Sequence, residues 1–402
     1  MFCKSNENNY KTLERSDMMK TYYYGKKIIL ANEVIKQGYI GVENGIITDI
    51  VTTLPSDELY ELIDYGQDIL SPGLVDTHIH GYHQADVMDN EAQALKTISK
   101  GLLEMGVTSW LATTLTSSTQ ALDAVCTTIG QSYQDMPGAK IQGIFLEGPY
   151  FTKTYKGAQN EKYMSDPSIE QLKHWQDLSG GIIKKIAIAP EREGVKDFIH
   201  AANKMGIYVG LGHSDATIEQ ASEAVNNGAS IFIHTFNGMR GLHHREPGMV
   251  GAALTLPQVF AELIADGYHV HQMAARLLVK ARGPQETVLI TDCMRAGGVG
   301  EGESYIGELA VDVKDGQARL REGGNLAGSI LKLIDGVKNM VDWGNADLVE
   351  ALRMASYTPA KSVGIENLCG QLRVGMPADF IVVSDHAELK ATYLDGVCLY
   401  QA

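Results

Sequence analysis

From residue 72 onward, short apolar segments alternate with segments of helical periodicity, and the pair repeats eight times. In the first helical segment Leu95, Ile98 and Leu102 recur at i, i+3 and i+7. Eight successive strand–helix units are typical of a closed parallel barrel. A doubly wound sheet is the alternative, but it would need fewer strands, and its GxGxxG fingerprint does not follow the first strand. The alternation therefore predicts an α/β fold, a (β/α)8 TIM barrel over residues 72–365.

The two ends of the chain differ from this central part. Residues 20–71 and 366–402 contain alternating, strand-like stretches, with turn signals at residues 43–45 and 395–396. We expect both ends to pair in one small β-sandwich domain beside the barrel. Residues 1–19 are polar and lack the apolar core of a secretion signal, so we expect a disordered leader there, with Met19 as an alternative start.

Charge and cysteine content narrow the classes of partner. The formal net charge of −15 over 402 residues argues against nucleic acid or an anionic membrane, because both need a basic face. No apolar run approaches the length of a membrane span. The five cysteines show no CxxC spacing and no disulfide pattern, which favours a reducing cytoplasm. A small anionic substrate stays compatible, since it needs only a local cluster of positive groups.

Two histidines stand one residue apart at the end of the first predicted barrel strand, in PGLVDTHIHG. Alternation places His78 and His80 on one face of the strand, together with Asp76. Two imidazoles on one face suit a divalent metal, with zinc, copper, iron or nickel as the ions that imidazole favours. The motif is short, so one buried histidine beside one solvent-facing histidine is the alternative.

The other barrel strands support the metal hypothesis, because chemistry in such barrels occurs at the carboxyl ends of the strands. Residue types that bind metals recur at those ends. They are His78, His80, Glu147, His213, His234, Asp266, His269 and Asp292. A purely structural explanation would require each of these polar residues to be satisfied separately by hydrogen bonds at the rim. A shared site explains the set more simply.

Ten short motifs carry a resemblance to a known family, and they occur in the expected order from about residue 71 to the C-terminus. They are PGLVDTHIHG, LEGPY, KGAQ, GHSDAT, HTFNGM, REPG, ADGYHV, TDCMRAGG, NLAGS and GQLRVGMPADFIV. In these motifs the chain resembles the amidohydrolase superfamily and, within it, the N-acetylglucosamine-6-phosphate deacetylases. The resemblance implies a cytoplasmic, homodimeric hydrolase of a phosphorylated amino sugar, acting in amino-sugar catabolism and cell-wall recycling.

The resemblance also implies a divalent metal cofactor, one or two ions per chain. Glu147, His213 and His234 match the family's primary metal ligands. His78 and His80 match the further ligands of members that hold a second ion, whereas some relatives lack this pair and use one metal. Zinc is the expected ion, with iron, manganese or cobalt as alternatives.

A catalytic acid/base and a substrate-binding set follow from the same resemblance. Asp292 matches the residue that acts as general base and then general acid, while a metal-activated water attacks the acetyl carbonyl. Its alternative is a plain metal ligand. Substrate contacts are implied at Ala158, Gln159, Asn237, Gly238, Arg245, His269, Asn325, Leu326 and Ala327. The chain departs from some relatives at Gln159, where they have histidine. A variable segment suggests that His83 approaches the site.

Two local features bear on specificity. Other members of the superfamily often bridge two metals with a carboxylated lysine on strand four. In this chain Lys184 and Lys185 lie early in that strand, and Glu191 occupies its catalytic end. This argues against a dihydroorotase or hydantoinase. The loop after His234 carries Arg245, whose planar fork matches phosphate oxygens. The resemblance places Arg245 at the family's phosphate position, and a solvated surface turn is the alternative.

Two other functions stay open at this point. A deaminase of adenine-like rings would use a similar metal site but would have no use for a phosphate-binding loop. A non-catalytic barrel in an assembly would usually lose ligands, and here none is missing.

Overall fold

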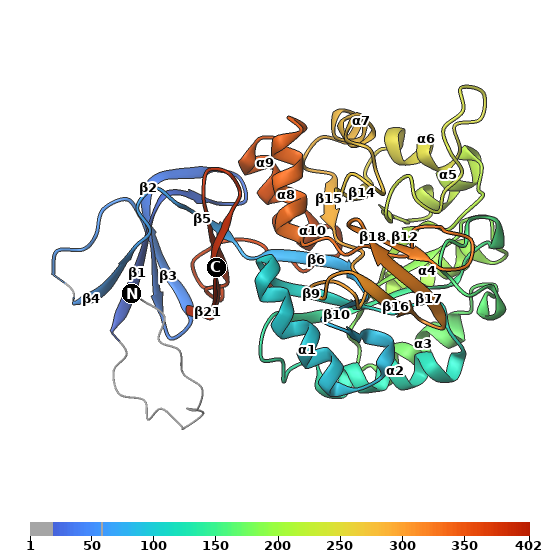
Figure 1. Cartoon of the computed structure of the whole chain (residues 1–402), viewed down its shortest axis with the longest axis horizontal. Helices are drawn as coiled ribbons and strands as arrows, with labels where there is room; N and C mark the ends of the chain where they lie inside the picture. The colour runs from blue at the N-terminus through green and yellow to red at the C-terminus, as the bar shows by residue number, and fades with distance from the viewer. Residues whose placement is uncertain (1–18, 58) are drawn as a thin grey trace.

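A computed structural model describes residues 19–57 and 59–402, so most of the expected leader, residues 1–18, lies outside the described residues. The described chain forms a barrel and a smaller β domain, and the β domain contains strands from both ends of the chain (Figure 1). The predicted fold class is confirmed.

All eight predicted barrel strands are present, and they pair in parallel in one sheet. The strands are β6 (Leu74–Ile79), β9 (Val107–Thr113), β10 (Lys140–Tyr150), β11 (Ile183–Ile188), β12 (Tyr208–Leu211), β13 (Ile231–Phe232), β14 (Phe260–Ile264) and β15 (Thr287–Ile290). Beyond the end of β15, Asp292 donates its backbone N–H to the carbonyl of His78 at 2.9 Å. This bond joins the last strand to the first and helps to close the barrel.

Helices cover the outside of the barrel, as the periodicity predicts. They are α1 (Ala92–Leu102), α2 (Thr119–Ser132), α3 (Ile169–Leu178), α4 (Val195–Lys204), α5 (Ile218–Asn226), α6 (Gly248–Thr255), α7 (Gln272–Arg282), α8 (Leu333–Asp342), α9 (Leu348–Met354) and α10 (Tyr357–Ser362). In α1 the periodic residues Leu95, Ile98 and Leu102 are buried, and burying each contributes about 1.5–3 kcal/mol. None of the described helices is long and apolar enough to cross a membrane.

Short segments complete the barrel loops. They are β7 (Gly81–Tyr82), β8 (Ala85–Asp86), η1 (Val87–Asp89), η2 (Leu103–Met105), η3 (Lys153–Tyr155) and η4 (Glu161–Tyr163).

The small domain is one eight-stranded sheet. Its strands are β1 (Lys20–Ile29), β2 (Val34–Glu43), β3 (Ile46–Val51), β4 (Tyr60–Asp64), β5 (Ile69–Pro72), β19 (Phe380–Val383), β20 (Leu389–Leu394) and β21 (Val397–Gln401). Tyr23 packs edge-on against Phe380 and Tyr393, with ring centres 4.9 and 5.2 Å apart. Residues from both ends of the chain therefore share one apolar core in this sheet.

One element was not predicted from the sequence: a three-stranded antiparallel sheet inserted between β15 and α8. It consists of β16 (Gly302–Ile306), β17 (Leu309–Lys314) and β18 (Gln317–Leu320). Ile306, Val311 and Val313 are buried in a cluster that includes Leu115 and Met294. The inserted sheet crosses the barrel in Figure 1 and supplies part of the cavity wall described below.

Candidate active site

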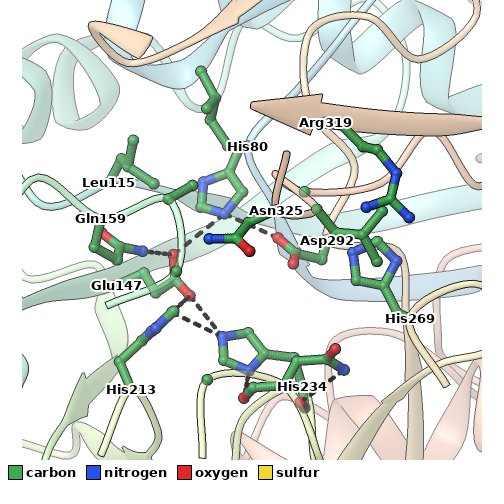
Figure 2. A pocket seen from close by; sticks show the side chains of 17 residues that line it. His80, Leu115, Glu147, Gln159, His213, His234, His269, Asp292, Arg319 and Asn325 are labelled. Atoms are coloured by element: carbon green, nitrogen blue, oxygen red, sulfur yellow. Dashed lines mark hydrogen bonds and ion pairs between the residues drawn. The ribbon is translucent and has the colours of Figure 1, made fainter. Parts of the chain in front are cut away.

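A cavity of about 370 Å³ lies at the carboxyl end of the barrel strands. Figure 2 shows polar side chains from several strand ends pointing into it. The lining residues are His80, Leu115, Glu147, Gly157, Ala158, Gln159, His213, His234, Asn237, Gly238, His269, Asp292, Ile306, Arg319, Asn325, Leu326 and Gly328.

Glu147, His213 and His234 form the first potential metal-binding group. Oε1 of Glu147 lies 3.3 Å from Nε2 of His213 and 3.1 Å from Nε2 of His234, and these two nitrogens are 3.1 Å apart. The Nδ1 atom of His213 donates to the carbonyl of Tyr155 at 2.9 Å, and that of His234 donates to the carbonyl of Asn237 at 3.0 Å. In the neutral rings both Nε2 atoms therefore present lone pairs. Two lone pairs and a carboxylate that converge in this way call for a cation between them.

His78, His80 and Glu147 form a second group, which shares Glu147 with the first. Nε2 of His78 lies 3.3 Å from Oε1 of Glu147, and Nε2 of His80 lies 3.4 Å from Oε2. Asp292 Oδ1 is 3.2 Å from Nε2 of His80. His78 donates from Nδ1 to Glu262 at 3.0 Å, and its Nε2 is buried with no hydrogen-bond partner among the described residues. A buried nitrogen without a hydrogen-bond partner is unusual, and a bound cation would satisfy it.

The protonation behaviour of the second group agrees with this reading. Burial lowers the pKa of His78, but the carboxylates of Asp292 and Glu147 outweigh burial and raise the pKa to about 9. Burial raises the pKa of Glu147, but the surrounding histidines hold it well below its usual value. The ionised carboxylates of Glu147 and Asp292 therefore favour a positive charge in the space that they share with the imidazole rings. A divalent cation held by nitrogen and oxygen donors would supply that charge, so these residues fit a divalent metal site.

Three of the predicted site residues have unusual backbone conformations. His213, His234 and Asp292 have φ values of 45°, 29° and 49°, a region that non-glycine residues seldom occupy. Each residue follows the last residue of its strand by two positions. The chain therefore turns sharply where the ligand side chains project, and local strain of this kind is common at functional sites.

Gln159 and His269 are held in fixed orientations at the edge of the two groups. Gln159 donates from Nε2 to Oε2 of Glu147 at 2.6 Å, and its Oε1 accepts from the backbone of Thr116 at 2.9 Å. The position at which some relatives have histidine is thus in contact with Glu147. His269 donates from Nδ1 to Asp266 at 2.6 Å, which leaves its Nε2 for the cavity.

Most of the positions implied for substrate contact line the cavity. They are Ala158, Gln159, Asn237, Gly238, His269, Asn325 and Leu326. Ala327 lies behind the wall, fully buried, and donates its N–H to Ala318. Arg245 is exposed outside this cavity, where its guanidinium contacts His244 at 2.8 Å.

One expectation about a neighbouring residue needs correction. His83 does not approach the site: its ring stacks on Tyr82 with centres 4.4 Å apart, and its Nε2 lies 3.5 Å from Glu104. The reason is backbone geometry, since the chain reverses at His83 with a φ of 51°. Asp76, on the same strand as His78 and His80, accepts from the Thr291 hydroxyl through Oδ2 at 2.6 Å.

Sequence reasoning missed several residues of the site. Arg319, Leu115 and Ile306 line the cavity, and two of them come from the unpredicted inserted sheet. Glu262 contacts His78 from inside the barrel. A charged residue within the apolar strand FAELI was the available signal for Glu262. For Arg319, the alternation around the Asp315-Gly316 turn was the signal.

Comparisons with known proteins agree with this geometry. The model of the Amidohydrolase family matches residues 69–398. An N-acetylglucosamine-6-phosphate deacetylase of Vibrio furnissii is 42% identical over 361 residues, covering 90% of each chain. An N-acetylgalactosamine-6-phosphate deacetylase of Escherichia coli O157:H7 is 38% identical over 330 residues, covering 82% of this chain and 87% of the relative.

A solved structure is similar over nearly the whole chain. It is an N-acetyl-D-glucosamine-6-phosphate deacetylase of Mycobacterium smegmatis, determined in complex with N-acetyl-D-glucosamine-6-phosphate. The TM-score is 0.90 at 26% identity, covering 96% of this chain and 100% of the other. With its barrel, its two ligand groups and a family match over most of its length, the chain is a hydrolase that belongs to the metal-dependent amidohydrolase family.

Proposed function

We propose that the chain hydrolyses the N-acetyl group of N-acetyl-D-glucosamine 6-phosphate to D-glucosamine 6-phosphate and acetate. The observation that carries the proposal is the pair of ligand groups that share Glu147, with Asp292 beside them in the cavity. The names of the relatives in Vibrio furnissii and Mycobacterium smegmatis support this substrate.

Amide hydrolysis needs an activated nucleophile and a protonated leaving nitrogen. A divalent metal supplies part of this chemistry when bound, because it lowers the pKa of a bound water to about 7 and polarises a carbonyl. We assign the proton transfers to Asp292, which takes a proton from the attacking water and delivers it to the departing amine. Burial raises the pKa of Asp292, but His78 and His80 outweigh burial and lower it, so its carboxylate is ionised at neutral pH and ready to act as the base.

Other cavity residues would bind and orient the sugar. His269 presents Nε2 to the cavity because Asp266 holds its Nδ1, so we assign it to the acetyl carbonyl or a sugar hydroxyl. Gln159 fixes Oε2 of Glu147. The remaining assigned contacts are Ala158, Asn237, Gly238, Asn325, Leu326 and Ala327.

The test of this function is acetate release from N-acetyl-D-glucosamine 6-phosphate, measured before and after chelation together with the metal content. We expect activity to disappear on chelation and to return with Zn²⁺. The galactosamine epimer belongs in the same assay, because one relative is named for it. Faster turnover of the epimer would reassign the substrate. Release of ammonia from an adenine-like ring instead of acetate would favour the deaminase alternative.

The presence of two ligand groups supports two metal ions per chain. We propose one ion, zinc, at Glu147, His213 and His234, and a second at His78, His80 and Glu147. Changing His78 and His80 together to alanine removes two nitrogen donors from the second group only. We therefore expect at most one ion per chain and reduced but measurable acetate release, measured by elemental analysis and initial rates. Two retained ions would refute the second assignment.

Two arginines are candidates for the 6-phosphate. Arg319 lines the cavity and is anchored by Gln317 and by the carbonyl of Gly324 at 2.7 Å. The hydrogen bonds that its guanidinium makes to described residues go to neutral acceptors, Gln317 and Gly324. Arg245 lies outside the cavity of its own chain, so we propose that it reaches a sugar held by a second copy in a homodimer. Both fit a phosphate, since guanidinium groups bind it in a bidentate way.

Replacing either arginine with alanine tests this assignment. A charge-assisted contact contributes about 1.5–3 kcal/mol, and 1.4 kcal/mol is about tenfold. The change should lower kcat/KM for the phosphorylated sugar about 10- to 100-fold. It should leave kcat/KM for N-acetylglucosamine almost unchanged. Lysine at the same position should restore only part of the loss. The measurement is the ratio of kcat/KM for the two sugars, and an arginine whose removal leaves that ratio unchanged does not bind the phosphate.

The cellular compartment and the oligomeric state are proposals as well. We place the enzyme in the cytoplasm as a homodimer. Cys126, Cys293 and Cys369 are free thiols and are buried, which supports a reducing compartment.

A further inference from the structure

Lys185 and Glu262 form a fully buried ion pair underneath the two metal-binding groups. They project from β11 and β14 into the barrel interior, with exposed fractions of 0% and 1%. Nζ of Lys185 contacts Oε1 of Glu262 and lies 3.7 Å from the ring centre of Phe145. Neither residue lines the cavity, so neither is placed to touch substrate.

A buried pair of this kind calls for an explanation other than stability. Removing two charges from water costs several kcal/mol per ion, and hydrophobic replacements of buried pairs are often neutral or stabilising. The interior of a barrel is ordinarily filled by apolar side chains. The pair therefore points to a role in positioning its neighbours.

The second oxygen of Glu262 shows which neighbours are positioned. Oε2 accepts from Nδ1 of His78 at 3.0 Å and from the backbone N–H of His234 at 3.3 Å. One carboxylate thus contacts one residue of each metal-binding group. The contacts differ, because Glu262 holds the ring of His78, whereas the ring of His234 is held by Asn237. Loss of Glu262 should therefore disturb the group containing His78 much more than the other.

We propose that Glu262, held in place by Lys185, is a positioning residue that directs Nε2 of His78 to the second metal and so sets the affinity of that site. A bond from Nδ1 to a carboxylate fixes the ring orientation and keeps the lone pair on Nε2, where the metal binds. Lys185 holds the other carboxylate oxygen and keeps the carboxylate from turning. The inference rests on the proposed metal role of His78 and is independent of the substrate.

The test replaces both members of the pair, Glu262→Gln with Lys185→Met, so that no unpaired charge stays buried. The full-length protein is stripped with a chelator and titrated with Zn²⁺ alone, against a competing chelator dye. Changes to such outer partners typically cost about 10- to 100-fold in metal affinity. We expect wild type to bind two ions. The double variant should keep the ion at Glu147, His213 and His234, whereas its Zn²⁺ affinity at the second site should fall about 10- to 100-fold.

A single change guards against misfolding of the double variant. Glu262→Asp keeps the charge that Lys185 needs but withdraws the carboxylate from His78 by one methylene group. We expect it, too, to weaken the second site selectively.

The matched control is the ion pair between Lys140 and Asp379, which joins the start of β10 to the small domain at 2.9 Å. The charged partners of Lys140 are Asp379 and Asp395, and neither belongs to a metal-binding group. Lys140→Met with Asp379→Asn should lower the melting temperature and leave both Zn²⁺ affinities unchanged. The proposal is overturned if the second-site affinity is unchanged in the Glu262 variants, if both sites weaken equally, or if wild type binds a single Zn²⁺. Acetate release is not part of this readout, so failure of the proposed deacetylation is distinguishable from failure of this inference.

Discussion

Asp292→Asn is expected to lower kcat for acetate release by about 100- to 10,000-fold, which is the usual contribution of general acid–base catalysis. The amide has nearly the shape of the carboxylate, but it cannot accept the proton of the attacking water. Glu147, His213 and His234 are unchanged, so the first metal should stay bound. The measurement pairs steady-state kinetics with metal content.

The control for Asp292 is the same chemical change at a carboxylate outside the cavity. Asp123 in α2 accepts from the indole of Trp175 at 2.9 Å, and Asp123→Asn should leave kcat within about twofold, because surface-side substitutions seldom disturb a distant site. If Asp292→Asn retained near wild-type turnover, the acid/base role would be refuted. If the variant lost its metal as well, Asp292 would act chiefly as a ligand, which is the alternative raised by the sequence.

The barrel strands could be predicted because each one leaves a local signal. A strand that is buried on both faces has a nearly continuous apolar sequence, and β15, with the sequence TVLI, shows such a run. The ligand residues could be predicted for a related reason. Residues such as His213 and His234 directly follow such runs, and the barrel brings all carboxyl ends of its strands to one rim.

The missed residues depend on information that a local pattern does not contain. The contact between Lys185 and Glu262 depends on the register of β11 and β14, which β12 and β13 separate in the sheet. Arg319 reaches the cavity only because the inserted sheet folds back across the barrel mouth. The prediction that His83 approaches the site was wrong for a local reason. A positive φ at that residue turns its ring onto Tyr82. Side-chain direction after a sharp turn cannot be read from spacing.

His213→Ala should remove metal and activity together, in contrast to Asp292→Asn. His213 contributes one of three donor atoms to the first group, and even changes to outer partners of ligands cost about 10- to 100-fold in metal affinity. We therefore expect Zn²⁺ affinity at the first site to fall by more than about 100-fold. Activity at limiting metal should fall in parallel, measured by titration of chelator-treated protein.

The response to added metal separates these two roles. Excess Zn²⁺ should restore part of the activity of His213→Ala, because affinity is what that change lowers and mass action compensates for lower affinity. Excess Zn²⁺ should not restore Asp292→Asn, since its defect lies in proton transfer. His200→Ala, an exposed histidine in α4, is the control and should keep both metal and activity. Full metal occupancy in His213→Ala at limiting Zn²⁺ would show that the first ligand group is wrongly assigned, and the metal would then have to be held by the group containing His78.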